Sequence, residues 1–112
     1  MSMHVEKIGE VAVVEAPGEE LDAGNAPDFK IGMAPVLESS TRVVLDMRRL
    51  RFVDSSGLGA ILSCMRQLAA KGGELKLCGL SEAVRSIFEL VRMHRVFDIH
   101  DTPEEAIEAF RR

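Results

Sequence analysis

The chain has 112 residues, with 14 Lys and Arg against 18 Asp and Glu, and a formal net charge of −4. This acidic balance argues against nucleic acid as the main ligand, because affinity for a phosphate backbone comes from clustered basic side chains. A chain of this length buries about 65% of its unfolded surface, so we expect residues 1–112 to fold as one domain without disulfide or metal support.

The N-terminal residues predict a β-hairpin. Apolar or alternating residues occupy 4–8 and 11–15, and Gly9-Glu10 joins the two runs. Pro17-Gly18 then ends the second strand.

A first helix is predicted to begin at Asn25-Ala26-Pro27-Asp28, where a capping residue precedes a proline in the first turn. The apolar spacing predicts a buried face made of Phe29, Met33, Val36 and Leu37. We expect a kink or a break at Pro35, helped by Gly32, because a proline deep in a helix removes a hydrogen bond and costs about 3 kcal/mol.

The middle of the chain predicts a strand, a sharp corner and a long helix. Residues 42–47 form a β-branched and aliphatic run typical of a buried strand. After Val53-Asp54-Ser55-Ser56-Gly57, apolar residues recur at helical spacing until about Lys71, where Gly72-Gly73 suits a left-handed C-terminal cap. That helix face consists of Leu58, Ile61, Leu62, Met65, Leu68 and Ala69.

The corner holds polar residues at a helix start. Asp54, Ser55 and Ser56 are the residue types that accept hydrogen bonds from the free amides of a first turn, so at least one should cap the helix. The residues alone leave two interpretations open, a cap with no further role or a cap beside a reactive hydroxyl. A phosphate on Ser55 or Ser56 would find favourable surroundings there, and Gly57 and Gly59 would leave the first turn nearly bare for a partner.

Four further elements are predicted in the C-terminal third. A fourth strand contains Leu75, Leu77 and Cys78, and Ser81 caps the next helix. That helix should pack through Val84, Ile87, Phe88 and Val91. Residues 96–99 predict a fifth strand, and the capping box at Thr102–Glu105 begins a helix through Phe110 that should dock by Ala106, Ile107 and Phe110.

This alternation predicts an α/β fold, with a mixed, mainly parallel five-stranded sheet, about four helices and an N-terminal β-hairpin. Binding sites in such sheets commonly lie beyond the carboxyl ends of the strands, where the Asp54 corner falls. The loop containing Asp22 follows the second strand and should open at the same end.

Self-contained catalysis is not indicated. Val53 stands where a serine hydrolase elbow needs its first glycine, and the chain has no P-loop. His4, His94 and His100 show no spacing for a catalytic triad or a metal site, so we expect no enzyme activity, metal or cofactor.

Cellular context is predicted from the remaining features. Cys64 and Cys78 lack metal or disulfide spacing and indicate core positions in a reducing compartment. No run of about 20 apolar residues is present, so we expect a cytoplasmic protein without membrane insertion. Arg48, Arg49 and Arg51 are either a solvated basic loop or contacts for a partner's carboxylates or nucleotide.

The run Leu45-Asp46-Met47, a spacer and then Phe52 to Gly59 resembles the signature of STAS domains, specifically the bacterial anti-sigma factor antagonists. The resemblance continues through 72–78 and 81–85, and 18–22 fits the family's early motif, so it covers nearly the whole chain. The Asp-Ser-Ser-Gly motif within its longer run is fairly specific.

The resemblance implies a non-enzymatic interaction module. The unphosphorylated protein would bind an anti-sigma factor that is also a serine kinase and so free a sigma factor. Phosphorylation of Ser55 would end binding, and a separate serine phosphatase would reset it. The implied contact residues are Asp22, Asp54, Ser55, Ser56, Gly57 and Leu58, with Leu58 as an apolar anchor on the first exposed turn. An alternative within the same fold is a STAS subunit of an ABC-type lipid transporter, docked on its cytoplasmic ATPase.

Overall fold

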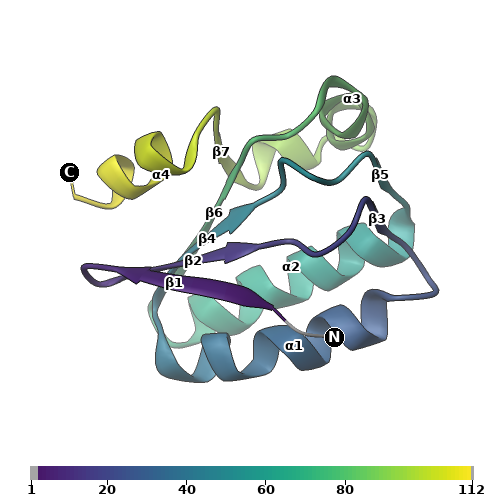
Figure 1. The fold of residues 1–112 in the computed structure, drawn as a ribbon. Helices are drawn as coiled ribbons and strands as arrows, with labels where there is room; N and C mark the ends of the chain where they lie inside the picture. The colour runs from purple at the N-terminus through teal and green to yellow at the C-terminus, as the bar shows by residue number, and fades with distance from the viewer. Residues whose placement is uncertain (1–2, 112) are drawn as a thin grey trace.

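A computed structural model describes residues 3–111 and contains a five-stranded sheet in the order β1-β2-β4-β6-β7 (Figure 1). β1 is antiparallel to β2, and the remaining neighbours are parallel. The strands are β1 (His4–Ile8), β2 (Val11–Glu15), β4 (Arg42–Asp46), β6 (Glu74–Cys78) and β7 (Asp98–His100). The predicted α/β fold and N-terminal hairpin are therefore confirmed, while the predicted domain range 1–112 extends past the described residues at both ends.

Helices cover both faces of the sheet. α1 (Ala26–Ser39) and α2 (Ser55–Ala70) lie together below it in Figure 1, and α4 (Pro103–Phe110) packs on the opposite face. α3 (Glu82–Leu90) and a 3₁₀ turn η1 (Met93–Arg95) complete the helical elements of the described chain. The predicted docking residues of α4, Ala106, Ile107 and Phe110, are all buried.

The central strands are apolar on both sides because both sides are covered. In β4, Val43 and Leu45 belong to the cluster with α1 and α2, whereas Val44 packs against α4. In β2, Ala12 and Val14 face the first cluster and Val11 and Val13 the second. This arrangement explains the continuous rather than alternating apolar runs in the sequence.

Two short strands were not predicted. β3 (Glu20–Leu21) and β5 (Phe52–Val53) pair in parallel as a separate two-stranded sheet. Glu20 is opposite Phe52, and Leu21 is opposite Val53. This pairing holds the segment before α1 beside the segment before α2, and it thereby positions the candidate site.

The first helix differs from expectation at Pro35 and at its N-cap. α1 continues through Pro35 to Ser39, so the prediction that Pro35 breaks this helix is wrong. Pro35 deprives the Ile31 carbonyl of its helical donor, and the 70% exposure of Ile31 places that residue on the solvent side of the helix. Asn25 occupies the N-cap position but makes no side-chain capping bond, because its amide group instead braces the preceding loop.

The C-terminal region shows two further corrections. Val91 was predicted to be buried on a helix face, and Val96 was predicted to begin a strand. Both side chains are about half exposed. α3 ends at Leu90, Arg92 adopts a left-handed backbone with φ 62°, and η1 intervenes before β7 begins at Asp98. The left-handed cap after α2 is confirmed by Gly72, whose φ is 76°.

Candidate functional site

Asp54 organises the corner between β5 and α2. Its Oδ1 accepts the Gly57 amide at 2.9 Å and caps α2, as predicted, while its Oδ2 accepts the Ala23 amide at 3.0 Å. Its own amide donates to the Leu21 carbonyl at 3.2 Å. The Gly57 bond is the largest influence and, helped by the Ala23 bond, it outweighs the opposing effect of burial, so the pKa of Asp54 lies below its ordinary 3.8 and the group is anionic at neutral pH.

Gly57 is required by the protein's own backbone. A Cβ at this position would lie 2.2 Å from the Leu21 carbonyl oxygen, so β3 passes directly over the first turn of α2. Gly57 is consequently buried, and the prediction that it leaves this turn bare for a partner is wrong. Gly59 does match that description, because it is exposed and a Cβ there would meet nothing within 4 Å.

Leu58 is a core residue. Its side chain is 7% exposed and belongs to the apolar cluster between the sheet and the helices α1 and α2. The prediction that Leu58 forms an exposed apolar anchor is therefore wrong. The helix period explains the outcome, because Leu58 shares its face with the fully buried Ile61 and Leu68.

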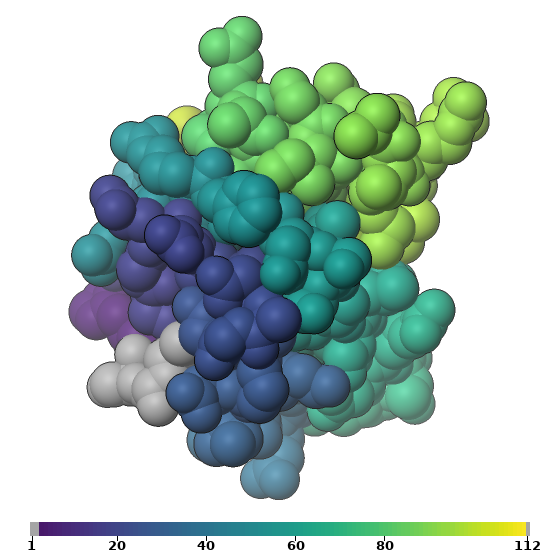
Figure 2. Space-filling model, turned by 90° about the vertical axis from the view of Figure 1, so that its right-hand side faces the viewer, coloured from purple at the N-terminus to yellow at the C-terminus, as the bar shows by residue number. Residues whose placement is uncertain are grey.

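Ser55 and Ser56 are both exposed on the first turn of α2. Figure 2 shows this side of the molecule, where the dark-blue segment before α1 lies against the teal start of α2 and below the green α3. Both Asp54 carboxylate oxygens bind backbone amides of neighbouring segments. The corner therefore combines a rigid anionic cap with hydroxyl-bearing residues open to solvent.

The Asp22 loop opens at the same end of the sheet, as predicted. The Asp22 amide donates to Asn25 Oδ1 at 2.9 Å, and Asp22 Oδ1 accepts the Gly24 amide at 3.0 Å. Asn25 Nδ2 also donates to the Glu20 carbonyl at 2.8 Å. These local bonds shape the loop, and the Ala23 bond to Asp54 ties it to the start of α2.

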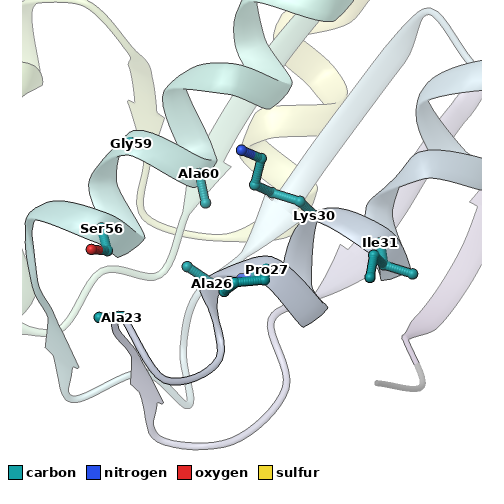
Figure 3. Close-up of a pocket in the computed structure, with 8 residues that line it drawn as sticks. All are labelled: Ala23, Ala26, Pro27, Lys30, Ile31, Ser56, Gly59 and Ala60. Atoms are coloured by element: carbon teal, nitrogen blue, oxygen red, sulfur yellow. The ribbon is translucent and has the colours of Figure 1, made fainter.

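A groove of about 680 Å³ lies beside this corner, between the first turns of α1 and α2. Figure 3 shows the Ser56 hydroxyl at one end and Lys30 extending from α1 toward α2. The sequence prediction missed this groove. The sequence feature that indicates the groove is the helical position of Lys30 and Ile31, which point outward between the buried residues Phe29 and Met33. The lining residues are Ala23, Ala26, Pro27, Lys30, Ile31, Ser56, Gly59 and Ala60.

The three arginines do not act alike. Arg48 makes a forked contact with the buried Asp46 carboxylate, with Nη2 2.7 Å from Oδ2. The hydrogen bond to Asp46 is the main reason why the pKa of Arg48 is raised. Arg48 therefore supports the end of β4, whereas Arg49 and Arg51 are exposed and keep both interpretations open.

The described residues contain no group of three or more His, Cys, Asp or Glu side chains arranged to hold a metal ion. His4 lies 3.8 Å from Glu15 and His100 lies 3.0 Å from Asp98, at separate places in the sheet. Burial raises the pKa of the Cys64 thiol to about 11 and that of Cys78 to about 12, so both are unreactive thiols. Within residues 3–111, no helix has the length and apolar character needed to cross a membrane.

Comparison with known proteins supplies the family context. A family model described as STAS domain matches residues 2–106. A putative anti-sigma factor antagonist, BtrV of Bordetella bronchiseptica, is 31% identical over 112 residues, covering 99% of this chain and 96% of BtrV.

Solved structures agree. The crystal structure of a putative anti-sigma factor antagonist from Thermotoga maritima is 26% identical, with a TM-score of 0.90 over 98% of this chain and 95% of that protein. The phosphorylated form of SpoIIAA, a Bacillus cell fate determinant, is 27% identical, with a TM-score of 0.71 over 97% of this chain and 99% of SpoIIAA.

Proposed function

Because the chain belongs to the STAS domain family, we propose that it is an anti-sigma factor antagonist that acts by binding rather than by catalysis. In its unphosphorylated form it binds an anti-sigma factor and thereby frees a sigma factor for transcription. Phosphorylation of Ser55 ends that binding. The observation that carries the proposal is an exposed Ser55 at the rigid, Asp54-capped start of α2, in a chain whose relatives are named anti-sigma factor antagonists.

The proposed contact surface is formed by Asp22, Asp54, Ser55 and Ser56. The Asp54 bonds to Ala23 and Gly57 hold its two segments in a fixed relation before a partner arrives. Gly57 and Leu58 contribute from beneath, by allowing β3 to approach and by anchoring α2 in the core. A preformed surface of this kind binds without first paying the entropy of ordering its loops.

Phosphorylation changes the charge of this surface more than it changes its shape. A phosphoserine adds about −1.5 to −2 charge at neutral pH. At Ser55 this charge adjoins the anionic Asp54, in a chain of formal charge −4. Free amides at the helix start favour the phosphate in the isolated protein, whereas a partner surface must remove its water. A penalty of about 3 kcal/mol lowers affinity roughly a hundredfold.

The proposed partners follow from this switch. The anti-sigma factor acts as the serine kinase for Ser55, using ATP and magnesium, and a serine phosphatase restores the binding form. Both enzymes require access to the hydroxyl, and the exposure of Ser55 supports that access. The cytoplasm is the compartment that supplies ATP to such a cycle, so we place the protein there.

The proposal is tested by capturing partners from the source cell on the immobilised protein and incubating the complex with ATP and magnesium. Peptide mass spectrometry then locates the phosphate. We expect it on Ser55, with labelling abolished in Ser55→Ala and retained in Ser56→Ala, the matched control. Labelling of Ser56 alone, or capture of a transporter ATPase without a kinase, would contradict the proposal.

A further inference from the structure

The outer edge of β1 has no strand beside it in the described chain. β1 is the first strand in the sheet order and, within residues 3–111, pairs only with β2. Four of its five residues are exposed, and the apolar side chain of Val5 is 44% exposed. An open edge of this kind is a template for a further strand unless the sequence blocks it.

The register shows which β1 residues present their backbone groups outward. The Ala16 amide donates to the Asp46 carbonyl at the end of β4. Backbone groups of successive residues point to opposite sides of a strand, so the even-numbered residues of β2 bond to β4 and the odd-numbered ones bond to β1. Their partners in β1 are His4, Glu6 and Ile8. The backbone amides and carbonyls of Val5 and Lys7 therefore point away from the sheet.

The usual protection of such an edge is weak here. Lysine side chains commonly block edge pairing, but Lys7 Nζ donates to Ser40 Oγ at 3.0 Å and is directed toward the end of α1. No proline interrupts β1. Val5 and its outward backbone groups are left accessible between His4 and Glu6.

Of the antiparallel registers centred on His4, Val5, Glu6 or Lys7 of two β1 strands, only the Val5 register matches side chains well. With Val5 opposite Val5 of a second copy, each His4 faces a Glu6, so an apolar pair is flanked by two imidazole–carboxylate pairs. Shifting the centre to Glu6 places two carboxylates opposite each other, a centre at Lys7 opposes two ammonium groups, and a centre at His4 opposes two imidazoles.

We propose that the outer edge of β1 is a self-association surface on which a second copy of this chain pairs in antiparallel fashion, centred on Val5. The two five-stranded sheets then form one continuous sheet about a two-fold axis. The interface is small, so the dimer is of the weak class. β1 is the edge strand of the five-stranded sheet, whereas Ser55 follows β5 of the separate two-stranded sheet, so the pairing does not use the Ser55 corner.

A cysteine pair tests the register. In Val5→Cys the two introduced residues lie directly opposite each other with Cα atoms about 5.5 Å apart, within the Cα range that a disulfide spans. In the matched Lys7→Cys variant they are offset by four residues, or about 14 Å, beyond disulfide reach. Mild oxidation should cross-link Val5→Cys and leave Lys7→Cys monomeric, since the native Cys64 and Cys78 are buried. Cross-linking of Lys7→Cys in preference to Val5→Cys would overturn the proposed register.

Sedimentation tests the association without a cross-link. The average mass of the native protein should rise above 12.3 kDa between about 10 µM and about 1 mM, a range suited to a small interface. Val5→Pro removes an outward amide that β2 does not use and should stay monomeric, and Glu6→Lys should weaken association at least tenfold. A native protein that stays monomeric throughout, or a folded Val5→Pro variant that associates normally, would overturn the proposal. Phosphorylation of Ser55 in Val5→Pro should be unchanged, which separates this proposal from the proposed function.

Discussion

Asp54 and Ala23 are joined across 31 residues of sequence by a 3.0 Å hydrogen bond from the Ala23 amide to Asp54 Oδ2. The other carboxylate oxygen caps α2 through Gly57. One side chain therefore fixes both the helix that carries Ser55 and the loop that carries Asp22. A carboxylate is needed for this double role, because both of its oxygens accept hydrogen bonds.

Asp54→Asn should loosen this junction. An asparagine presents one acceptor oxygen, so either the Gly57 or the Ala23 amide loses its partner. We expect the melting temperature to fall by a few degrees and the Ala23 amide to exchange with solvent faster, measured by calorimetry and NMR. Asp28→Asn, the same change at an exposed residue of α1, is the control. Equal effects in the two variants would show that the junction adds nothing.

The Asp54 carboxylate also predicts an acid dependence. Its pKa is lowered in the folded state, chiefly by the Gly57 amide, so its contribution to stability is present above the unfolded value near 3.8 and is lost as the pH falls through the folded pKa. Urea unfolding between pH 3 and pH 6 should show a loss of stability toward low pH that is smaller in Asp54→Asn. An identical pH profile for both proteins would contradict this assignment.

Two glycines in the same helix turn should respond oppositely to alanine. Gly57→Ala should destabilise the fold by about 1–3 kcal/mol, because its Cβ meets the Leu21 carbonyl and β3 or α2 must shift. Gly59→Ala should stabilise it by about 0.5–1 kcal/mol, because the site is open and alanine favours helix. Urea unfolding measures both, and a harmless Gly57→Ala would refute the close approach of β3.

Leu58→Ala should act on stability before binding. The side chain is buried among core residues, and such truncations cost about 2–5 kcal/mol. Chemical unfolding should show this loss, while affinity for the captured partner, measured on the folded fraction at low temperature, should change less than threefold. A stable Leu58→Ala protein with greatly reduced affinity would restore the exposed-anchor hypothesis.

Lys76 should stabilise the face of the sheet that α4 covers. It is 5% exposed, and its Nζ lies 2.5 Å from Asp98 Oδ2, 2.9 Å from Glu74 Oε2 and 4.7 Å from the centre of the Phe110 ring. Burial works to lower the pKa of Lys76, but the hydrogen bonds and charges of Asp98 and Glu74 outweigh it and raise it.

Lys76→Met should therefore destabilise the protein by about 1–2 kcal/mol. Removing one partner of a fully buried ion pair costs about 3–5 kcal/mol, and the loss is smaller here because both carboxylates are partly solvated. Urea unfolding measures the change, and Lys30→Met at an exposed position provides the control. An unchanged midpoint in Lys76→Met would show that this ion cluster is dispensable.

The larger elements of the fold were predictable because their signals are local. The hairpin register follows from Gly9-Glu10, and the burial of both faces of β4 follows from its unbroken apolar run. β3 and β5 were missed because two-residue strands carry no periodicity, and their pairing joins residues far apart in sequence. The prediction of a break at Pro35 was wrong because α1 continues on both sides of the proline. The carbonyl that loses its donor belongs to Ile31, which lies on the solvent side of the helix.

The site was predictable in its residues but not in its surroundings. Asp54 and Ser55 follow from the helix-start signal, and the structure gives them the expected capping and exposed positions. The burial of Gly57 and the Ala23 bond depend on how β3 passes over α2, which no local pattern encodes. The groove near Lys30 likewise exists only once two helices from different parts of the chain are placed together.

The proposed switch is tested most directly by titrating the captured anti-sigma factor with the protein in two forms, unmodified and fully phosphorylated at Ser55, in a calorimeter. The account predicts that the phosphorylated form binds at least about a hundredfold more weakly, with circular dichroism and melting temperature nearly unchanged. Equal affinities, or a loss of affinity that accompanies unfolding of the phosphorylated protein, would contradict it.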